Sequence, residues 1–391
     1  MKVIVAGGGY AGLAAALRVK RRDPDNIDVT VVNDGPRLVE RIRLHQESTG
    51  QAVRQRPLRP LLARADVRFV EGRVEGIRPA SRHLIVSGVA MPYDRLVLAL
   101  GSAPRTDDVP GAAEHAFTLT GAHARGLAQR LRRLAGHGGR VAVVGTGLCG
   151  VEAATEIAEA FPALHVTLVG RAPPLDGWSE TARTHVQEVC ARLGILVRAG
   201  VEVNGIGPGW LEAGGAAVAF DACIWATGFE VPWIGWDAGL AINRDGRIRV
   251  DAELRSVSHP EIYAVGDIAA PQHAEIPAGC KSAMPMGAHA GDNLAREQRG
   301  GVPLPFDYAV LFYCVSLGRR AGVIQWPGAD GSLRGPAWTG WRAAWMKELI
   351  CRSTCWALDW ESRGLPAVAW RQGEGGPVAS GSVPLARGAG D

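Results

Sequence analysis

The feature that most constrains this chain is a glycine-rich turn that occurs twice, each time between an apolar strand pattern and a helix pattern. The first turn reads GGGYAG at 7–12, after the apolar run 3–6 and before the helix-forming sequence LAAALRVKRR. This is the dinucleotide pattern G-x-G-x-x-G in the setting that it requires. Gly7 makes the tight turn, Gly9 lets a pyrophosphate approach the backbone, and Gly12 lets helix and strand pack closely. The N–H groups of the helix start, at Tyr10 and Ala11, would hold the phosphates.

The same pattern returns 138 residues later, from Gly7 to Gly145. The strand sequence RVAVV leads into GTGLCG at 145–150, followed by the helix-forming VEAATEIAEAF and the strand sequence HVTLV. Gly145, Gly147 and Gly150 take the three glycine positions of the pattern. Two complete strand–turn–helix–strand units predict two nucleotide sites in one chain. A protein with two bound dinucleotides most naturally passes a hydride from one to the other.

The strand after each turn ends where such folds bind the ribose. The first of these strands ends at Asn33 and Asp34, so Asn33 could hydrogen-bond the first ribose. The second ends at Gly170 and Arg171, with no carboxylate. A 2′-phosphate then meets no repulsion, and Arg171 could pair with it. We expect NADPH or NADH as co-substrate and favour NADPH; the alternative is that Arg171 is a solvated loop residue.

Composition and charge exclude several classes of protein. The 391 residues are 47% hydrophobic and 21% charged, which excludes a disordered chain. A net charge of +4 is too small and too dispersed to indicate nucleic acid binding. No apolar run approaches the roughly 18 residues that span a membrane, and three glycines break the N-terminal apolar stretch, unlike in a signal peptide. The seven cysteines are scattered with no CxxC pair, which predicts no metal site and favours a reducing, cytoplasmic setting.

Three further segments extend the two turns to a family resemblance. They read LVLALGS at 96–102, CIWATG at 223–228 and IYAVGD at 262–267. In order and spacing these motifs resemble the flavin-containing pyridine nucleotide–disulfide oxidoreductase superfamily over residues 1–300. The resemblance implies an α/β fold of the glutathione-reductase type, with two Rossmann-like domains, for FAD and NAD(P)H, and a C-terminal α+β interface domain. The implied boundaries are 1–112 with 240–305 for FAD, 113–239 for NAD(P)H, 306–371 for the interface domain and 372–391 for a flexible tail.

The resemblance also implies which residues contact the cofactors. Asp267 would hold the ribityl chain of FAD, and the backbone of the segment 71–74, which ends at Val74, would contact its adenine. The implied FAD contacts are Gly7, Gly9, Tyr10, Ala11, Gly12, Asn33, Arg41, Val74, Gly101, Gly266 and Asp267. The implied contacts of NADPH or NADH are Gly145, Gly147, Gly150, Arg171 and Gly228.

The residues beside the flavin separate the branches of this superfamily. No cysteine precedes Cys149, so no thiolate can take electrons from the flavin, and disulfide reduction is excluded. The Gly-Val-Glu start of the second helix is similar to type II NADH:quinone oxidoreductases and the apoptosis-inducing factor group. By that resemblance Glu152 would orient the nicotinamide or relay protons, with a pKa raised by burial. His45 and Gln46 would line the flavin pocket, where His45 could carry a proton; alternatively, both only cap and pack a helix.

Together these features predict an FAD-dependent NAD(P)H oxidoreductase that passes electrons to a quinone or a similar aromatic acceptor. One departure weakens the quinone assignment: the stretch 282–294 lacks the pair of Gln that quinone reductases of this type carry there. Lys281 and His289 are the polar candidates near the acceptor. The alternatives are a flavoprotein of small-molecule biosynthesis, a reductase for a small iron–sulfur protein, and an NAD(P)H-binding redox sensor with slow turnover.

The C-terminal part is rich in tryptophan. Two strands are expected, within 308–318 and 321–326, and then a helix over 339–360. The apolar residues that share one face of this helix are Trp341, Trp345, Leu349, Trp356 and Trp360. This face could contact the inner surface of a membrane, pack on the body of the protein or line the acceptor pocket. The oligomeric state, including a homodimer, stays open.

Overall fold

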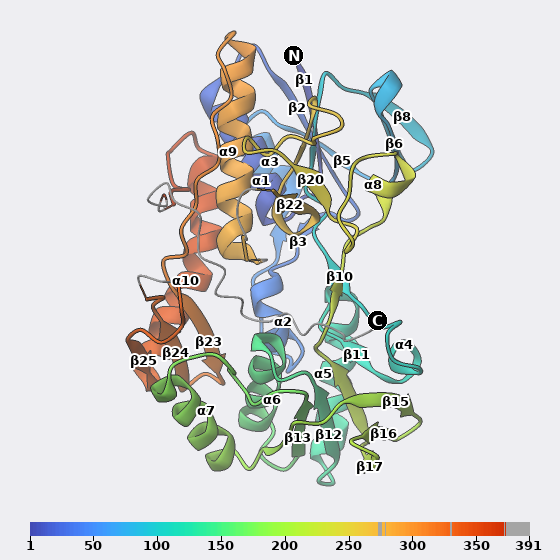
Figure 1. Ribbon diagram of the computed structural model, residues 1–391, viewed down its shortest axis with the longest axis vertical. Helices are drawn as coiled ribbons and strands as arrows, with labels where there is room; N and C mark the ends of the chain where they lie inside the picture. The colour runs from blue at the N-terminus through green and yellow to red at the C-terminus, as the bar shows by residue number, and fades with distance from the viewer. Residues whose placement is uncertain (273–275, 278, 329–330, 371, 373–391) are drawn as a thin grey trace.

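The computed structural model describes residues 1–272, 276–277, 279–328, 331–370 and 372. In the view of Figure 1 the chain forms an upper and a lower lobe, with the helix α10 (Gly340–Glu361) along one side. Each lobe contains a five-stranded sheet whose strands are all parallel. The predicted flexible tail, 372–391, lies outside the described residues apart from position 372.

The upper sheet has the strand order β21-β9-β1-β2-β5. Its strands are β1 (Lys2–Ala6), β2 (Asp28–Asn33), β5 (Arg68–Glu71), β9 (Arg95–Leu98) and β21 (Ile262–Ala264). The helix α1 (Tyr10–Arg22) packs on this sheet, and α9 (Cys280–Gln298) packs along α1 (Figure 1). A Cβ at Gly287 would lie 2.0 Å from the carbonyl oxygen of Ala11, so glycine is what lets these two helices approach.

The lower sheet has the strand order β11-β18-β12-β13-β14. Its strands are β11 (Phe117–Thr118), β12 (Arg140–Val144), β13 (His165–Gly170), β14 (Leu196–Ala199) and β18 (Ala222–Trp225). The helices of this lobe are α5 (Gly121–Ala135), α6 (Leu148–Ala160) and α7 (Glu180–Arg192). Leu127, Leu131 and Ile157 are fully buried in its core. The strand–turn–helix–strand unit thus occurs in both lobes, and the predicted α/β class is confirmed.

Short elements join and flank the two parallel sheets. β10 (Ala103–Pro104) pairs antiparallel with β19 (Phe229–Glu230), where the chain passes between the lobes. The other short strands of the two lobes are β3 (Arg37–Leu38), β4 (Arg56–Pro57), β6 (Val74–Arg78), β7 (His83–Val86), β8 (Val89–Pro92), β15 (Val203–Gly207), β16 (Trp210–Ala213), β17 (Ala216–Ala219), β20 (Ile248–Val250) and β22 (Ala269–Pro271). The short helices are η1 (Arg41–Arg43), α2 (Leu44–Glu47), α3 (Leu58–Ala63), η2 (Pro79–Ser81), α4 (Ala112–His115), α8 (Ile234–Asp237) and η3 (Gly266–Ile268). The predicted domain boundaries stay a prediction.

The C-terminal part is a three-stranded antiparallel sheet covered by α10. Its strands are β23 (Tyr313–Leu317), β24 (Ala321–Gln325) and β25 (Ala337–Thr339). The sequence predicts the first two and misses β25, which is three residues long and shows no alternation of apolar and polar residues. α10 packs on β24 and also against α1; its buried residues include Ala343, Cys351 and Leu358, of which Leu358 lies in the core of the upper lobe.

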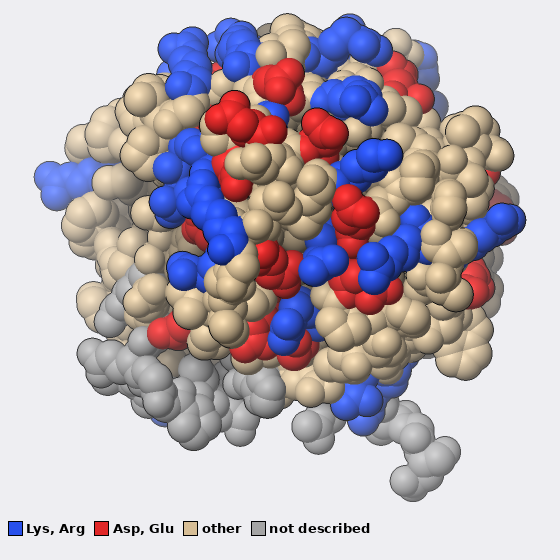
Figure 2. All heavy atoms as spheres, turned by 90° about the horizontal axis from the view of Figure 1, so that it is seen from above, with Lys and Arg blue, Asp and Glu red and all other residues tan. Residues whose placement is uncertain are grey.

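The opposite face of α10 carries the tryptophans and points outward. Trp341, Trp345, Trp356 and Trp360 are between 42% and 69% exposed. Of the three alternatives left open by the sequence, packing of these tryptophans on the body of the protein is therefore excluded. Figure 2 shows basic and acidic side chains interspersed over the upper end of the molecule, without a field of one sign, in keeping with the small net charge of +4.

Candidate active site

In the upper lobe the glycine turn connects β1 to α1. Gly7 has φ +113°, and a Cβ there would lie 2.3 Å from the carbonyl oxygen of Ala99 on the neighbouring strand end. A Cβ at Gly12 would lie 1.9 Å from the carbonyl oxygen of Gly7. Both positions need glycine because of contacts within the protein itself.

The turn between β12 and α6 repeats this arrangement in the lower lobe. Gly145 has φ +116°, and a Cβ there would lie 2.6 Å from the carbonyl oxygen of Ala226. A Cβ at Gly150 would lie 1.7 Å from the carbonyl oxygen of Gly145. The two turns are thus equivalent in geometry as well as in sequence.

The middle glycine of each turn is not required by contacts within the described part of the protein. Gly9 and Gly147 have extended backbone angles that any residue adopts, with φ −81° and −70°. Among the described residues, no heavy atom lies within 4 Å of a Cβ built at either position. The open space in front of each lies at the N-terminus of a helix, where a pyrophosphate can approach the backbone N–H groups. Each turn therefore fits one dinucleotide.

A network of hydrogen-bonded polar groups lies at the carboxyl ends of β9 and β21, the edge at which parallel sheets bind ligands. Asp267 accepts hydrogen bonds from Ser102 Oγ (2.8 Å) and from the N–H of Gly279 (3.1 Å). The guanidinium of Arg41 donates to the carbonyl oxygen of Ser102 and lies beside Gly101. Arg41, Gly101 and Asp267, which are far apart in sequence, are thus brought together; their roles toward FAD stay predictions.

Asn33 braces the first glycine turn from the end of β2. Its Oδ1 accepts the N–H of Gly8 (2.8 Å), and its Nδ2 donates to the carbonyl oxygen of Gly35 (2.8 Å). The N–H of Gly72 donates to the carbonyl oxygen of Asn33, so the segment that leads to Val74 lies alongside. The ribose contact of Asn33 and the adenine contact of Val74 stay predictions.

At the end of β13, packing determines what can stand at the second ribose position. A Cβ at Gly170 would lie 2.7 Å from Oγ1 and 3.0 Å from the backbone nitrogen of Thr146. A side chain at position 170 would therefore require Thr146 to shift, and the sequence has no carboxylate there. Arg171 follows, with its side chain 51% exposed and its Nη1 3.6 Å from Oε1 of Glu202. The position thus offers a cation and no acid of its own.

Glu152 lies on α6, where four elements meet between the lobes. Its Oε1 accepts the N–H of Ser316 on β23 (3.0 Å) and lies 3.3 Å from Nζ of Lys347 on α10. Its Oε2 lies 3.8 Å from Nδ1 of His45 on α2. Burial acts to raise the pKa of Glu152, but Lys347, His45 and the Ser316 N–H together hold it below its ordinary value. The predicted upward shift is wrong, because the sequence reveals the burial but not the lysine that faces it.

His45 is buried between two glutamates of α6. Its Nε2 lies 3.9 Å from Oε2 of Glu156, one helical turn beyond Glu152. Arg319, in the turn between β23 and β24, pairs with the same Glu156 oxygen (2.8 Å). Burial lowers the pKa of His45 to about 4, and the charges of Arg319 and Lys347 act in the same direction. The imidazole is therefore neutral at pH 7.

Gln46 is buried and belongs to a hydrogen-bond network that connects α2 with α10. Its Oε1 accepts a hydrogen bond from Nη1 of Arg43 (2.9 Å). The same guanidinium donates twice to Glu348 of α10 (2.9 and 3.0 Å). These contacts describe a packing role for Gln46, and its catalytic role stays a prediction.

Sequence reasoning missed four residues of this cluster: Lys347, Arg319, Ser316 and Glu156. A signal for Lys347 was present, because it falls on the side of the helix opposite the tryptophans. Ala343 and Cys351, one turn before and after it, are both buried. A lysine on a buried helix face needs an acidic partner, and Glu152 is that partner.

The cysteines near this cluster are held as thiols. Burial raises the pKa of Cys351 to about 12 and that of Cys355 to about 11. Burial likewise raises the pKa of Cys149, inside the second turn, to about 11. None of these three is poised to react as a thiolate at neutral pH.

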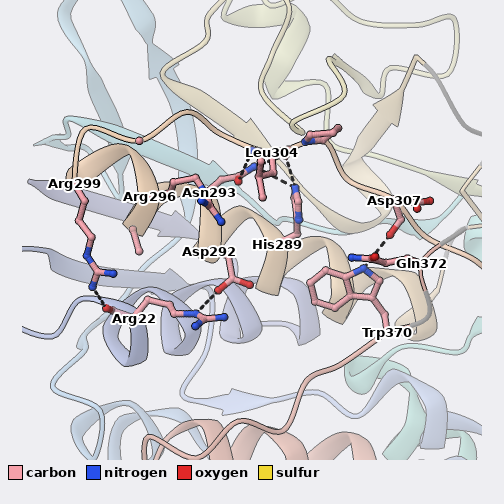
Figure 3. A pocket seen from close by; sticks show the side chains of 13 residues that line it. Arg22, His289, Asp292, Asn293, Arg296, Arg299, Leu304, Asp307, Trp370 and Gln372 are labelled. Carbon is pink, nitrogen blue, oxygen red and sulfur yellow. Dashed lines mark hydrogen bonds and ion pairs between the residues drawn. The ribbon is translucent and has the colours of Figure 1, made fainter. Parts of the chain in front are cut away.

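A cavity of about 530 Å³ lies on the outer side of α9, apart from the glycine turns (Figure 3). Two of its lining arginines form ion pairs: Arg22 with Asp292 at 2.6 Å, and Arg299 with Asp23 at 3.4 Å. His289 lines this cavity, where its Nε2 lies 2.8 Å from the carbonyl oxygen of Leu304. His289 was expected beside the acceptor; its described contacts are instead with this wall.

Within the described part of the chain, no group of His, Cys, Asp or Glu is arranged to hold a metal ion. None of the described helices has the length and apolar character needed to cross a membrane.

Two dinucleotide turns on two parallel sheets, with a buried acid–histidine–lysine cluster between them, define the class of two-nucleotide flavoprotein oxidoreductases. Comparison with known proteins bears this out. The family described as pyridine nucleotide-disulphide oxidoreductase matches residues 1–287, and the chain belongs to this family. It is an oxidoreductase with FAD as cofactor and NADH or NADPH as co-substrate, as predicted.

Three relatives illustrate the range of the match. An NADH dehydrogenase-like protein of Mycobacterium tuberculosis is 32% identical over 324 residues, which cover 76% of this chain and 80% of the relative. A type II NADH:quinone oxidoreductase of Staphylococcus aureus is 25% identical over 384 residues, covering 89% and 94%. The sulfide:quinone oxidoreductase structure from Aquifex aeolicus superposes with a TM-score of 0.81 at 19% identity, covering 94% and 93%, and shows the shared fold.

Proposed function

We propose that this chain transfers a hydride from NAD(P)H to FAD and delivers the electrons to a quinone or a similar aromatic acceptor. The observation that carries the proposal is the two-sided helix α10. One side places Lys347 3.3 Å from Glu152, and the other exposes four tryptophans. The exposed side offers apolar aromatic surface, and the buried side contributes a cation to the charged cluster between the lobes.

The residues of the cluster have distinct tasks in this scheme. FAD, when bound, supplies the chemistry of accepting a hydride and releasing two electrons. Lys347 provides a fixed positive charge that stabilises negative charge developing on a reduced acceptor. Glu152, ionised because of its low pKa, is ready to accept a proton for delivery to that acceptor. The S. aureus relative, named for NADH:quinone oxidoreduction, supports the acceptor class by similarity over most of its length.

We further propose that NADPH is preferred over NADH. An acid at the strand end would bind the ribose of NADH and repel a 2′-phosphate. Here position 170 is a glycine crowded by Thr146, and Arg171 stands next to it with half of its side chain in solvent. The preference would distinguish this chain from the relatives that are named for NADH.

The exposed face of α10 is proposed as a peripheral contact with a membrane surface that holds the quinone. Trp341 and Trp345 supply apolar anchors, and Arg342 lies over the Trp341 ring (5.6 Å to its centroid) where it can meet anionic headgroups. A homodimer that covers the same face is the competing outcome. Light scattering at several concentrations, beside flotation with vesicles, separates the two.

The experiment that tests the proposed function is anaerobic stopped-flow reduction of the holoenzyme by NADPH or NADH, followed by reoxidation. The acceptors to compare are a short-chain naphthoquinone, a ferredoxin and oxygen. Reoxidation by the quinone well above the oxygen rate is expected. Faster reoxidation by ferredoxin would instead identify an iron–sulfur protein reductase. Slow reoxidation by every acceptor would identify a redox sensor.

A further inference from the structure

The cavity on the outer side of α9 has two chemically different ends. The side chains of Arg22, Arg296 and Arg299 gather at one end, and Trp370 stands at the other (Figure 3). Its volume of about 530 Å³ falls in the range of small-molecule sites. Its lining residues include none from either glycine turn, so the cavity is separate from both dinucleotide sites.

At the arginine end, cations outnumber the acids that pair with them. Arg22 shares Asp292 with Arg18, because one carboxylate oxygen lies 2.6 Å from Arg22 and the other 2.8 Å from Arg18. Arg299 pairs with an acid at 3.4 Å and keeps 59% of its side chain in solvent. Arg296 is exposed and makes no hydrogen bond or ion pair among the described interactions. An anion at this end therefore meets a cation that no acid has to release.

Trp370 is fixed at the opposite end as a flat aromatic wall. Its Nε1 donates to the carbonyl oxygen of Asp307 (2.9 Å). Its ring meets that of His289 edge to face, with centroids 6.1 Å apart, and lies 6.0 Å from the ring of Phe306. The indole is partly exposed. A ring held in this way is a preorganised surface on which a nucleobase can stack.

His289 stands between the two ends (Figure 3) and is only 8% exposed. Its Nε2 lies 2.8 Å from the carbonyl oxygen of Leu304, so this nitrogen carries the ring proton. Burial lowers the pKa of His289, so the ring is neutral at pH 7 and its Nδ1 is an acceptor. Among the described residues, none donates a hydrogen bond to this Nδ1. A ligand with an amino group on its stacked ring supplies the missing donor.

The spacing of these groups selects an elongated ligand. His289 and Arg296 are seven positions apart on α9, which corresponds to about 10 Å along the helix. A simple anion reaches only the arginine end, and a simple aromatic ring reaches only Trp370. A nucleoside monophosphate carries a base and a phosphate at opposite ends of a ribose and therefore matches both.

We propose that this cavity binds the adenosine monophosphate group, with its phosphate on Arg296 and its adenine stacked on Trp370. The amino group of adenine donates to Nδ1 of His289, and a guanidinium is suited to bind a phosphate with two parallel hydrogen bonds. The same group is present in free AMP and in one half of NAD(P)⁺, and the test separates these two sources. The inference does not depend on the identity of the electron acceptor.

The test is a calorimetric titration of AMP into the FAD-loaded full chain, saturated beforehand with NADP⁺ or NAD⁺ so that both glycine turns are occupied. Arg296→Gln is expected to weaken AMP binding about tenfold, through loss of a hydrogen bond to a charged group. Trp370→Leu is expected to weaken it at least about fivefold, through loss of stacking, whereas Trp370→Phe keeps most of the affinity. The matched controls lie outside the cavity and are expected to change nothing: Arg192→Gln at the end of α7, and Trp236→Leu on the exposed side of α8.

The two halves of the ligand assign each end separately. Ribose 5-phosphate is expected to bind more weakly than AMP and to respond to Arg296→Gln but not to Trp370→Leu. Adenosine is expected to show the reverse. Binding of a second NADP⁺ that Trp370→Leu abolishes would support the site and identify the dinucleotide as its source of adenylate. FAD content and the melting temperature report whether each variant is folded.

Several outcomes would overturn the inference. Absence of AMP binding to the saturated holoenzyme is one, and binding only without coenzyme is another, since AMP then occupies the second glycine turn. Affinity that Arg296→Gln and Trp370→Leu leave unchanged, or that the two controls reduce equally, would also overturn it. Ribose 5-phosphate that binds as tightly as AMP would show a site for anions alone, with no part for the base.

Discussion

Replacing Arg171 by Gln tests the coenzyme preference, because the change is expected to weaken the binding of NADPH and not that of NADH. A hydrogen bond between a guanidinium and a phosphate contributes about 1.5–3 kcal/mol. Arg171 is half exposed, so solvent screening places its contribution near the lower value of about 1.5 kcal/mol. Since about 1.4 kcal/mol corresponds to a factor of ten, the dissociation constant of NADPH is expected to rise about tenfold.

Glu202→Gln is expected to change the affinity for NADPH in the opposite direction. Before the phosphate binds, Arg171 is attracted to Glu202 at 3.6 Å, an exposed pair worth up to about 1 kcal/mol. Removing this competitor is expected to tighten NADPH binding by up to about fivefold. Substitution of Gly170 by an acid is no clean substitute for this pair of variants, because its Cβ would lie 2.7 Å from Thr146 Oγ1.

The assay is anaerobic flavin reduction at increasing NADPH and NADH, which gives a dissociation constant and a limiting rate for each. The limiting rate is expected to stay constant, because the contact proposed for Arg171 is with the ribose end and not with the nicotinamide. Arg192→Gln is the control: it makes the same charge change at the end of α7, the opposite edge of the sheet. Equal weakening of NADPH and NADH in Arg171→Gln, or no change in either, would refute the assignment.

Three further expectations concern the turns, the cluster and the exposed helix. Gly9→Ala is expected to purify as a folded protein without FAD, which absorbance at the flavin band measures. Gly12→Ala is expected to lose about 1–3 kcal/mol of stability in thermal melts, because its Cβ would lie 1.9 Å from a carbonyl oxygen. Lys347→Gln removes a cation that lowers the pKa of Glu152, so this pKa is expected to rise. As the pH decreases, the rate of quinone reduction is then expected to start falling at a higher pH than in the unmodified enzyme. A pH–rate profile measures this shift. The double variant Trp341→Ser and Trp345→Ser is expected to bind anionic vesicles at least about tenfold more weakly in flotation assays, because even about 60 Å² of lost apolar contact is worth about 1.5 kcal/mol.

The parts of the site that the sequence predicted are those encoded within a few residues. A glycine turn, its strand and its helix follow one another directly, so the pattern around Gly7 and Gly145 determines local geometry without knowledge of the rest of the chain. The same holds for the amphipathic periodicity of the C-terminal helix, which placed its tryptophans on one face.

The contacts that set the chemistry of the cluster depend on elements distant in sequence. The pKa of Glu152 on α6 is set by Lys347 on α10 and by a backbone N–H of β23, and neither can be located from the motif that contains Glu152. The sequence therefore predicted the burial of this carboxylate and the wrong sign of its shift. Periodicity likewise groups residues on a helix face but does not say which face meets the protein.

The orientation of α10 follows from the polar group that it buries. Turning the tryptophans inward would move Lys347 to the surface and leave Glu152 buried without its cation. The free energy cost would be large, because a buried carboxylate without a cation is strongly destabilising. The face with Ala343 and Cys351 packs instead, and the tryptophans are left in solvent. One ion pair thus stabilises the ionised form of Glu152 and favours the exposure of the surface proposed for membrane contact. A change at Lys347 is therefore expected to affect acceptor chemistry and vesicle binding together, whereas a change at the tryptophans should affect vesicle binding alone.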